Sequence, residues 1–237
     1  MKYASLVAGS ILLSISLVGC PGEGQRGTSL REEQNAARSR LGAQMKEAAN
    51  TARTYHAMDN ATLLTRLVEQ SASLKEPFNS LAYRELKTRK DVDMNALASL
   101  VKENPNPGGL LPLLLLRRVD RTAYIAVPAE LRAKVLTESL QASKMFNTWG
   151  LPNFYLEDAS NALIESGQIV VPELSRMLND CRPAPLFGSK EAMLSQLYKY
   201  RLCDYALFFL KRIAGDERFK LPKTPEERDA LIGRTGK

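Results

Sequence analysis

The stretch Leu110-Leu-Pro-Leu-Leu-Leu-Leu-Arg-Arg118 is a dense apolar run that ends in two arginines. Pro112 is tolerated there because the first turn of a helix leaves its backbone N–H groups without intrahelical partners. Seven apolar residues fall far short of the roughly 20 that a helix needs to cross a bilayer. The stretch therefore predicts a short helix buried in a protein core, and the preceding loop Asn104-Pro-Asn-Pro-Gly-Gly109 marks where it begins.

The sequence on both sides of this helix has helical periodicity. Apolar residues recur at helical spacing from residue 60 onward, for example at Leu63, Leu64, Leu67 and Val68. Further helices are expected over residues 128–143, 152–166, 169–178, 189–214 with a break near residue 200, and 224–233. Only residues 123–127 suggest a strand. The predicted fold class is all-α.

Two of the expected helices share a local pattern. Leu156-x-Asp158-Ala159-Ser160 and Leu202-x-Asp204-Tyr205-Ala206 each lead into an apolar helix that ends near a glycine. With helix pairs beginning at offsets of roughly 32 to 46 residues, this pattern resembles the HEAT repeat family. The resemblance covers about residues 77–233 of a helical domain expected over residues 59–237, and it implies antiparallel helix pairs stacked into an α-solenoid. An irregular helical bundle is the alternative. Asp158 and Asp204 are each expected to cap or turn their own helix.

The chain begins with a segment that has the layout of a secretory signal. Lys2 precedes residues 4–18, which carry no charge, and small residues and Pro21 follow. Leu17-Val18-Gly19-Cys20 resembles the lipobox of bacterial lipoproteins. That resemblance implies that residues 1–19 are removed and that the Cys20 thiol carries the lipid. The alternatives are an ordinary signal that happens to end in cysteine and a retained membrane span.

The lipoprotein resemblance also implies where the protein resides. Acylated Cys20 would hold the chain in membrane lipid on the exported side of a cell membrane, facing the periplasm or in an outer membrane. Residues 21–28 are polar and glycine-rich and predict a flexible tether. Ser29 and Glu32 form a capping-box pattern that starts a stalk helix reaching about Met58. Three parts are thus expected: residues 1–19, 20–58 and 59–237.

Two cysteines remain once Cys20 is lipidated. An exported protein meets an oxidising compartment, so Cys181 and Cys203 are candidates for a disulfide. The alternative is that Cys203 is a free thiol in a helix core. No metal site is expected, because His56 is the only histidine and no CxxC pair is present.

The chemistry-bearing residues point to a binding protein rather than an enzyme. No nucleophile elbow, phosphate loop, dinucleotide fingerprint or zinc-protease motif occurs, so no catalytic residue and no cofactor is predicted. The net charge of +7 is dispersed, which argues against nucleic acid. Four aromatic residues between two helices form either a binding patch or a core plug, namely Phe146, Trp149, Phe154 and Tyr155.

The function expected from these observations is that of a membrane-anchored lipoprotein whose non-catalytic helical domain binds another protein or an envelope component. An envelope hydrolase or cell-wall enzyme is one alternative. A structural spacer is the other.

Overall fold

A computed structural model describes residues 23–73 and 80–235. The predicted signal peptide and the lipobox residues Leu17, Val18, Gly19 and Cys20 lie outside the described residues. The chain divides after Met58 into two units. The described part of the first is a helix, and the second is built of packed helices.

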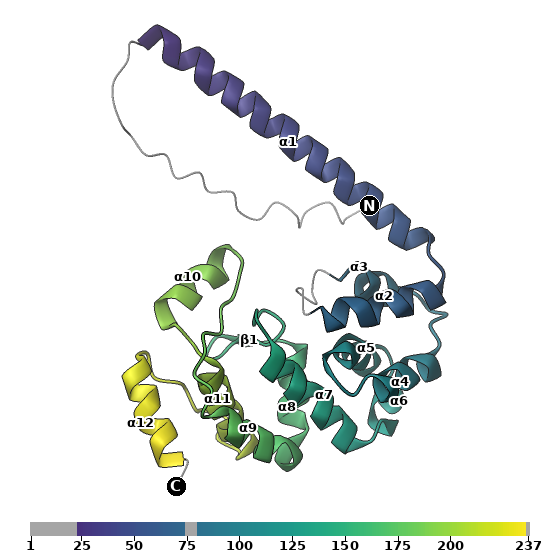
Figure 1. Ribbon diagram of the computed structural model, residues 1–237, viewed down its shortest axis with the longest axis vertical. Coiled ribbons are helices and arrows are strands. Elements are labelled where there is room, and N and C mark those ends of the chain that lie inside the picture. The colour runs from purple at the N-terminus through teal and green to yellow at the C-terminus, as the bar shows by residue number, and fades with distance from the viewer. Residues whose placement is uncertain (1–22, 74–79, 236–237) are drawn as a thin grey trace. The chain divides into compact units, whose positions relative to one another are not determined.

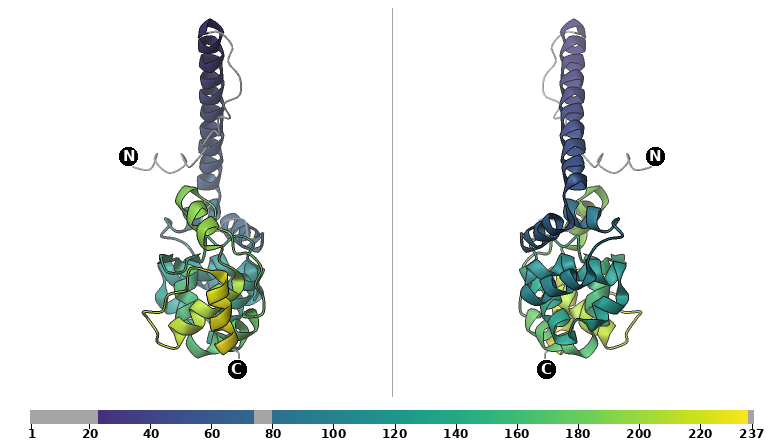
Figure 2. Two further views of the ribbon diagram at one scale, coloured as in Figure 1. Left: turned by 90° about the vertical axis from the view of Figure 1, so that its left-hand side faces the viewer. Right: turned by 90° about the vertical axis from the view of Figure 1, so that its right-hand side faces the viewer.

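The first unit is the straight helix α1, Glu23–Ala57 (Figure 2). It begins six residues before the expected start at Ser29, so the prediction of a flexible tether over residues 21–28 is wrong from Glu23 onward. Extending an existing helix by one residue costs far less than nucleating it, which lets the turn of residues 23–28 form despite two glycines. Its side chains from residue 32 to 57 are exposed, apart from half-buried Tyr55.

The second unit is all-α, as predicted, apart from two very short strands (Figure 1). Its described α-helices are α2 (Asn60–Ala72), α3 (Leu81–Leu86), α4 (Met94–Glu103), α5 (Leu110–Val119), α6 (Arg121–Ala126), α7 (Ala129–Ala142), α8 (Asp158–Glu165), α9 (Val171–Met177), α10 (Ser189–Tyr198), α11 (Leu202–Ile213) and α12 (Pro225–Thr235). Two 3-10 turns join them, η2 (Pro107–Gly109) before α5 and η3 (Gly167–Val170) before α9.

Two helices form the centre of this unit. Every residue of α5 from Leu110 to Leu116 is buried, and the helix packs against α2, α4 and α6. Residues Leu202 to Phe209 of α11 are likewise buried and pack against α8 and α9. Apart from Asp204, neither helix has a polar face before the basic residues of its last turn. Each helix must therefore be buried on all sides.

The strands are β1 (Gly150–Leu151) and β2 (Tyr155–Leu156), which form an antiparallel hairpin. Asn153 has a positive φ of 71° at the turn, a conformation that asparagine tolerates better than most residues. The expected helix over residues 152–166 therefore starts only at Asp158. The strand suggested for residues 123–127 is also wrong, because Asp120 accepts a hydrogen bond from Ala123 N (3.0 Å) and starts α6 there.

The two similar sequence patterns occupy different helix positions. Asp158 is the first residue of α8, whereas Asp204 is the third residue of α11 and accepts a hydrogen bond from Arg201 N (2.9 Å). Asp204 thus caps its own helix as expected, while Asp158 pairs with arginines of α5. Helix contacts join consecutive partners such as α4 and α5 and also non-consecutive ones such as α2 and α5 or α9 and α11. The solenoid arrangement stays a prediction.

Candidate binding surface

Helix α10 differs from the other helices of the second unit in that none of its described side chains is buried. Met193 and Leu197, one turn apart and therefore on the same face, are 68% and 70% exposed. Phe187, just before the helix, is 51% exposed, and Phe154 at the hairpin turn is 47% exposed. The rings of Phe154 and Tyr198 lie 5.2 Å apart, which joins the hairpin to the helix. We call these four exposed side chains (Phe154, Phe187, Met193 and Leu197) the α10 surface.

The helix belongs to a loop, residues 187–199, that projects from the packed helices (Figure 1). We call it the α10 loop. Residues 180–184 run antiparallel to residues 200–203, so the two ends of the loop are held side by side. Three backbone hydrogen bonds join the two segments: Ala184 N to Tyr200 O (2.9 Å), Leu202 N to Arg182 O (3.0 Å) and Cys203 N to Asp180 O (2.9 Å).

A disulfide between Cys181 and Cys203 closes the same base. Their Cα atoms lie 4.9 Å apart, within the range that a disulfide requires. Cys203 is fully buried in α11, whereas Cys181, just after the turn that follows α9, is exposed. The bond fixes the loop base covalently to the central helix of the unit.

Arg228 holds the C-terminal end of the α10 loop. Its guanidinium donates to the carbonyl oxygens of Tyr198 (3.0 Å) and Lys199 (3.2 Å), the last residues of the loop. Lys199 adopts a left-handed conformation with a φ of 48° and ends the helix. Arg228 also lies over the Tyr200 ring, 5.0 Å from its centroid. The chain is thereby fixed where it returns to α11.

Asparagine side chains hold the neighbouring segments in place. Asn153 at the hairpin turn exchanges two hydrogen bonds with the backbone of Leu221, each 2.9 Å long, and donates to the Tyr200 hydroxyl. Asn147 exchanges a similar pair with the backbone of Phe187 at 2.6 and 3.0 Å. Phe154 and Phe187 therefore extend from a fixed backbone.

The electrostatics of the hairpin side are mildly acidic. Partial burial raises the pKa of the Tyr155 hydroxyl, and the charges of Glu191 and Glu157 raise it further. Burial also raises the pKa of Glu157, with a smaller contribution from Asp158. Tyr155 is a neutral phenol at physiological pH, as an ordinary tyrosine is, and it can donate and accept hydrogen bonds beside Phe154.

The structure separates the four aromatic residues that the sequence grouped. Phe146 and Trp149 are fully buried, so a binding patch that includes them is wrong. The Trp149 indole N–H donates to Ser143 Oγ (2.9 Å), and the Phe146 ring lies 4.8 Å from the Tyr205 ring. These two residues form the plug between helices. Phe154 is exposed, and Tyr155 is half-buried beside it.

Sequence reasoning missed Phe187, Met193 and Leu197. The expected helix over residues 189–214 does break near Tyr200, but no separate role was expected for its first part. One signal was available, because Pro183, Pro185 and Gly188 isolate this segment from the preceding helices.

Apart from the α10 surface, a cluster of charged side chains joins α5, α6 and α8. Asp158 contacts Arg117 (3.7 Å) and Arg118 (3.2 Å), and Glu165 contacts Arg117 (3.2 Å) and Arg121. Each carboxylate pairs with two guanidinium groups: those of Asp158 lie on α5, and those of Glu165 lie on α5 and α6. The cluster therefore connects helices within the unit, and its members have partners already.

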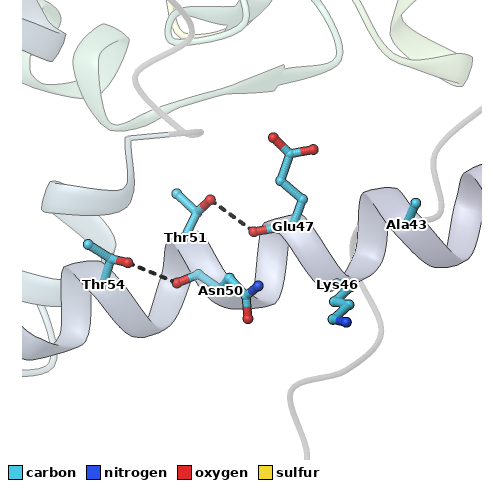
Figure 3. A pocket seen from close by; sticks show the side chains of 6 residues that line it. All are labelled: Ala43, Lys46, Glu47, Asn50, Thr51 and Thr54. Atoms are coloured by element: carbon cyan, nitrogen blue, oxygen red, sulfur yellow. Dashed lines mark hydrogen bonds between the residues drawn. The ribbon is translucent and has the colours of Figure 1, made fainter.

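A hollow along α1 is lined by one helix face and not by converging elements (Figure 3). The hydroxyls of Thr51 and Thr54 donate to carbonyl oxygens of their own helix, Glu47 O (2.9 Å) and Asn50 O (3.1 Å). All of its lining residues are exposed: Ala43, Lys46, Glu47, Asn50, Thr51 and Thr54.

Over residues 23–73 and 80–235, no cluster of metal-ligating side chains occurs, and no helix combines the length and apolarity needed to cross a membrane.

Comparison with known proteins gives no match: no family model, no curated protein and no solved structure corresponds to this chain.

Proposed function

We propose that this chain is a bacterial lipoprotein, lipidated at Cys20, whose helical domain binds an envelope component through the α10 surface. The anchor rests on the sequence Leu17-Val18-Gly19-Cys20 and on the short uncharged segment before it. The domain is proposed to be non-catalytic and to act without a cofactor.

One observation carries the binding role. The α10 loop is fixed at its base by a disulfide, three backbone hydrogen bonds and Arg228, yet the helix itself buries no described side chain. A helix with an exposed apolar face gains little from its own domain, because helices in proteins are stabilised mainly by packing that face. A rigid base beneath a helix that exposes Met193 and Leu197 suits the display of a contact surface. Exposed aromatic and large apolar residues are also the side chains that dominate binding sites.

Lipid labelling tests the anchor. The Cys20→Ala variant is expected to lose incorporation of labelled fatty acid and retention in the membrane fraction, because the thiol is the acylation site. Ser29→Ala, outside the lipobox, is the matched control and should retain both. Membrane retention of a fully processed Cys20→Ala protein would contradict the proposal.

Cross-linking in cells tests the surface. A photoreactive amino acid at Leu197 is expected to form adducts, whereas one at Ile125 should not. Ile125 is the matched control because it is an apolar residue of α6 that is 59% exposed and lies outside the α10 surface. Equal labelling at both positions would argue against a specific contact.

A spacer function is favoured by one feature, the length of α1. Its 35 residues extend about 52 Å at 1.5 Å per residue. If the chain is a spacer, replacing Met193 and Leu197 by serine leaves its cellular role intact, and shortening α1 abolishes it.

A further inference from the structure

We propose that helix α12 is a releasable latch, which docks through the guanidinium group of Arg228 and holds the C-terminal end of the α10 loop. When α12 separates from α11, that end of the loop is freed while the rest of the unit stays folded. The latch belongs to the helical unit alone and operates whether or not Cys20 carries lipid.

Helix α12 is attached to the unit mainly by polar contacts. It lies beside α11 at the edge of the unit (Figure 1). Among residues 225–233 of this helix, whose burial the structure describes, Arg228 alone is buried, while Leu231 and Ile232 are half-buried. Helices in proteins are stabilised mainly by packing an apolar face. A helix that docks through one buried cation therefore loses little hydrophobic stabilisation when it separates.

The site that receives Arg228 is matched to a guanidinium group. Asp204 Oδ2 lies 3.0 Å from Arg228 Nε, and the centroid of the Tyr200 ring lies 5.0 Å from Arg228 Cζ. The carbonyl oxygens of Tyr198 and Lys199, at the end of the α10 loop, accept from Arg228 Nη2 at 3.0 and 3.2 Å. A planar guanidinium can contact a carboxylate, a ring face and carbonyl oxygens at once, whereas an ammonium is a compact point charge. Docking of α12 and closure of this end of the loop are therefore one event.

Release of α12 does not leave a buried charge unpaired. The Asp204 carboxylate keeps Arg201, whose backbone N–H (2.9 Å), Nε (3.1 Å) and Nη2 (3.0 Å) donate to its oxygens. Arg228 passes into water, where a cation is well solvated. The base of the α10 loop also stays closed, because its disulfide and its three backbone hydrogen bonds do not involve α12. The opening is thus confined to α12 and the C-terminal end of the loop.

Hydrogen exchange of the full chain, followed by NMR, tests the latch. In the wild-type protein, the amides of α12 should exchange faster than those of residues 202–209 in α11, because local opening exposes α12 without unfolding the core. The Lys199 amide, which donates to Ser195 O (2.9 Å), should report the same opening equilibrium as α12.

The Arg228→Met variant should release the latch permanently. Its α12 and Lys199 amides should exchange within about tenfold of the rate of an unstructured peptide, because an isolated helix of this length is marginal in water. Residues 202–209 should stay protected, with a loss no larger than the free energy of docking. Arg228→Lys should also release α12, because an ammonium cannot serve Asp204 and the carbonyl oxygens together. Arg218→Met, at an exposed position before the helix, is the matched control and should leave exchange unchanged.

Four outcomes would overturn the proposal or one part of it. Equal protection of α12 and α11 in the wild-type protein would show that they open only together, and this measurement does not depend on the folding of any variant. Protection retained at Lys199 after release of α12 would overturn the hold on the α10 loop. Wild-type protection in Arg228→Lys would overturn the requirement for a guanidinium, and release of α12 in Arg218→Met would show that docking does not depend on Arg228.

Discussion

Arg228 Nε lies 3.0 Å from Asp204 Oδ2, and the side chains of both residues are fully buried. The same guanidinium donates to four backbone carbonyl oxygens, those of Tyr198, Lys199, Pro222 and Lys223. One side chain of α12 therefore connects the N-terminal turn of α11, the end of the α10 loop and the segment before its own helix. A buried charge requires this kind of pairing, because isolated ions are strongly disfavoured away from water.

Replacing Arg228 by methionine is expected to destabilise the protein severely. The substitution removes one of two guanidinium partners of the buried Asp204 carboxylate, the other being Arg201 (3.0 Å), and it removes the donor to four backbone carbonyl oxygens. Each buried polar group that loses its partner costs about 1–3 kcal/mol. Urea unfolding followed by far-ultraviolet circular dichroism measures the loss. Arg218→Met is the control, since Arg218 is exposed, and it should change the free energy of unfolding by less than about 0.5 kcal/mol. A loss of similar size in both variants would show that the Arg228 contacts contribute little.

Reduction of the disulfide is expected to lower the free energy of unfolding by about 3 kcal/mol. Cys181 and Cys203 are 22 residues apart, and closing a loop of that length restricts the unfolded chain by this amount in the chain-entropy model. Unfolding of oxidised and reduced protein gives the difference, and Cys181→Ser with Cys203→Ser should reproduce the reduced value. Two free thiols in the unreduced, delipidated protein would mean that the bond does not form in solution.

The α10 surface should tolerate polar substitution without loss of stability. Met193→Ser and Leu197→Ser remove side chains that are about two-thirds exposed, so each should change the free energy of unfolding by less than about 0.5 kcal/mol. Leu207→Ala in α11 is the matched comparison, because Leu207 is fully buried and its truncation should cost about 2–5 kcal/mol. Thermal or urea unfolding separates the two classes. A cost near that of Leu207→Ala would mean that α10 packs within the domain.

Asp229 should contribute to acid sensitivity. Its carboxylate accepts a hydrogen bond from Arg201 (2.7 Å), and this contact holds the pKa of Asp229 below its usual value near 3.8. A lowered pKa in the folded state gives stability that is present above the ordinary value and is lost as pH falls through the folded value. Asp229→Asn should therefore lower stability at neutral pH, by less than about 1 kcal/mol because the pair is partly exposed.

The control for this prediction is the exposed Asp216→Asn. The difference in unfolding free energy between wild type and Asp229→Asn should shrink as pH falls below the ordinary value near 3.8, and it should vanish as pH falls through the lowered pKa of the folded state. A difference that stays constant down to strongly acidic pH would contradict the assigned role of the charge.

The core was predictable where local composition alone decides burial. The leucines of α5 have no polar face to expose, and Thr224 and Glu227 show the reciprocal hydrogen bonds that their capping-box spacing predicts. Arg228 was not predictable, because it lies in a helix whose sequence is typical of a solvent-exposed one. Its carbonyl partners come from segments up to 30 residues away. The sequence similarity around Asp158 and Asp204 also misled, because a shared pattern does not determine the helix position at which it falls.

The aromatic residues between α7 and α8 also show that the sequence alone does not predict which side chains are buried. Phe146 and Phe154 are eight residues apart in one connecting segment, yet one is fully buried and the other half exposed. The difference depends on the hairpin turn at Asn153, whose hydrogen-bond partner is Leu221. Long-range contacts of this kind decide which aromatic residues face solvent, and the linear sequence does not contain them.

Because its base is closed independently of its tip, the α10 loop can be replaced by another sequence. Its hydrogen bonds use backbone atoms of residues 180–184 and 200–203, and its covalent bond lies in the same segments. The contacts at Phe187, Tyr198 and Lys199 also use backbone atoms, so the fold places few demands on the exposed side chains between residues 187 and 197. Lengthening a surface loop adds little closure entropy. Insertions, exchanged helices or a grafted epitope at this site are therefore compatible with an unchanged domain, and the protein can acquire new contacts here without rebuilding its core.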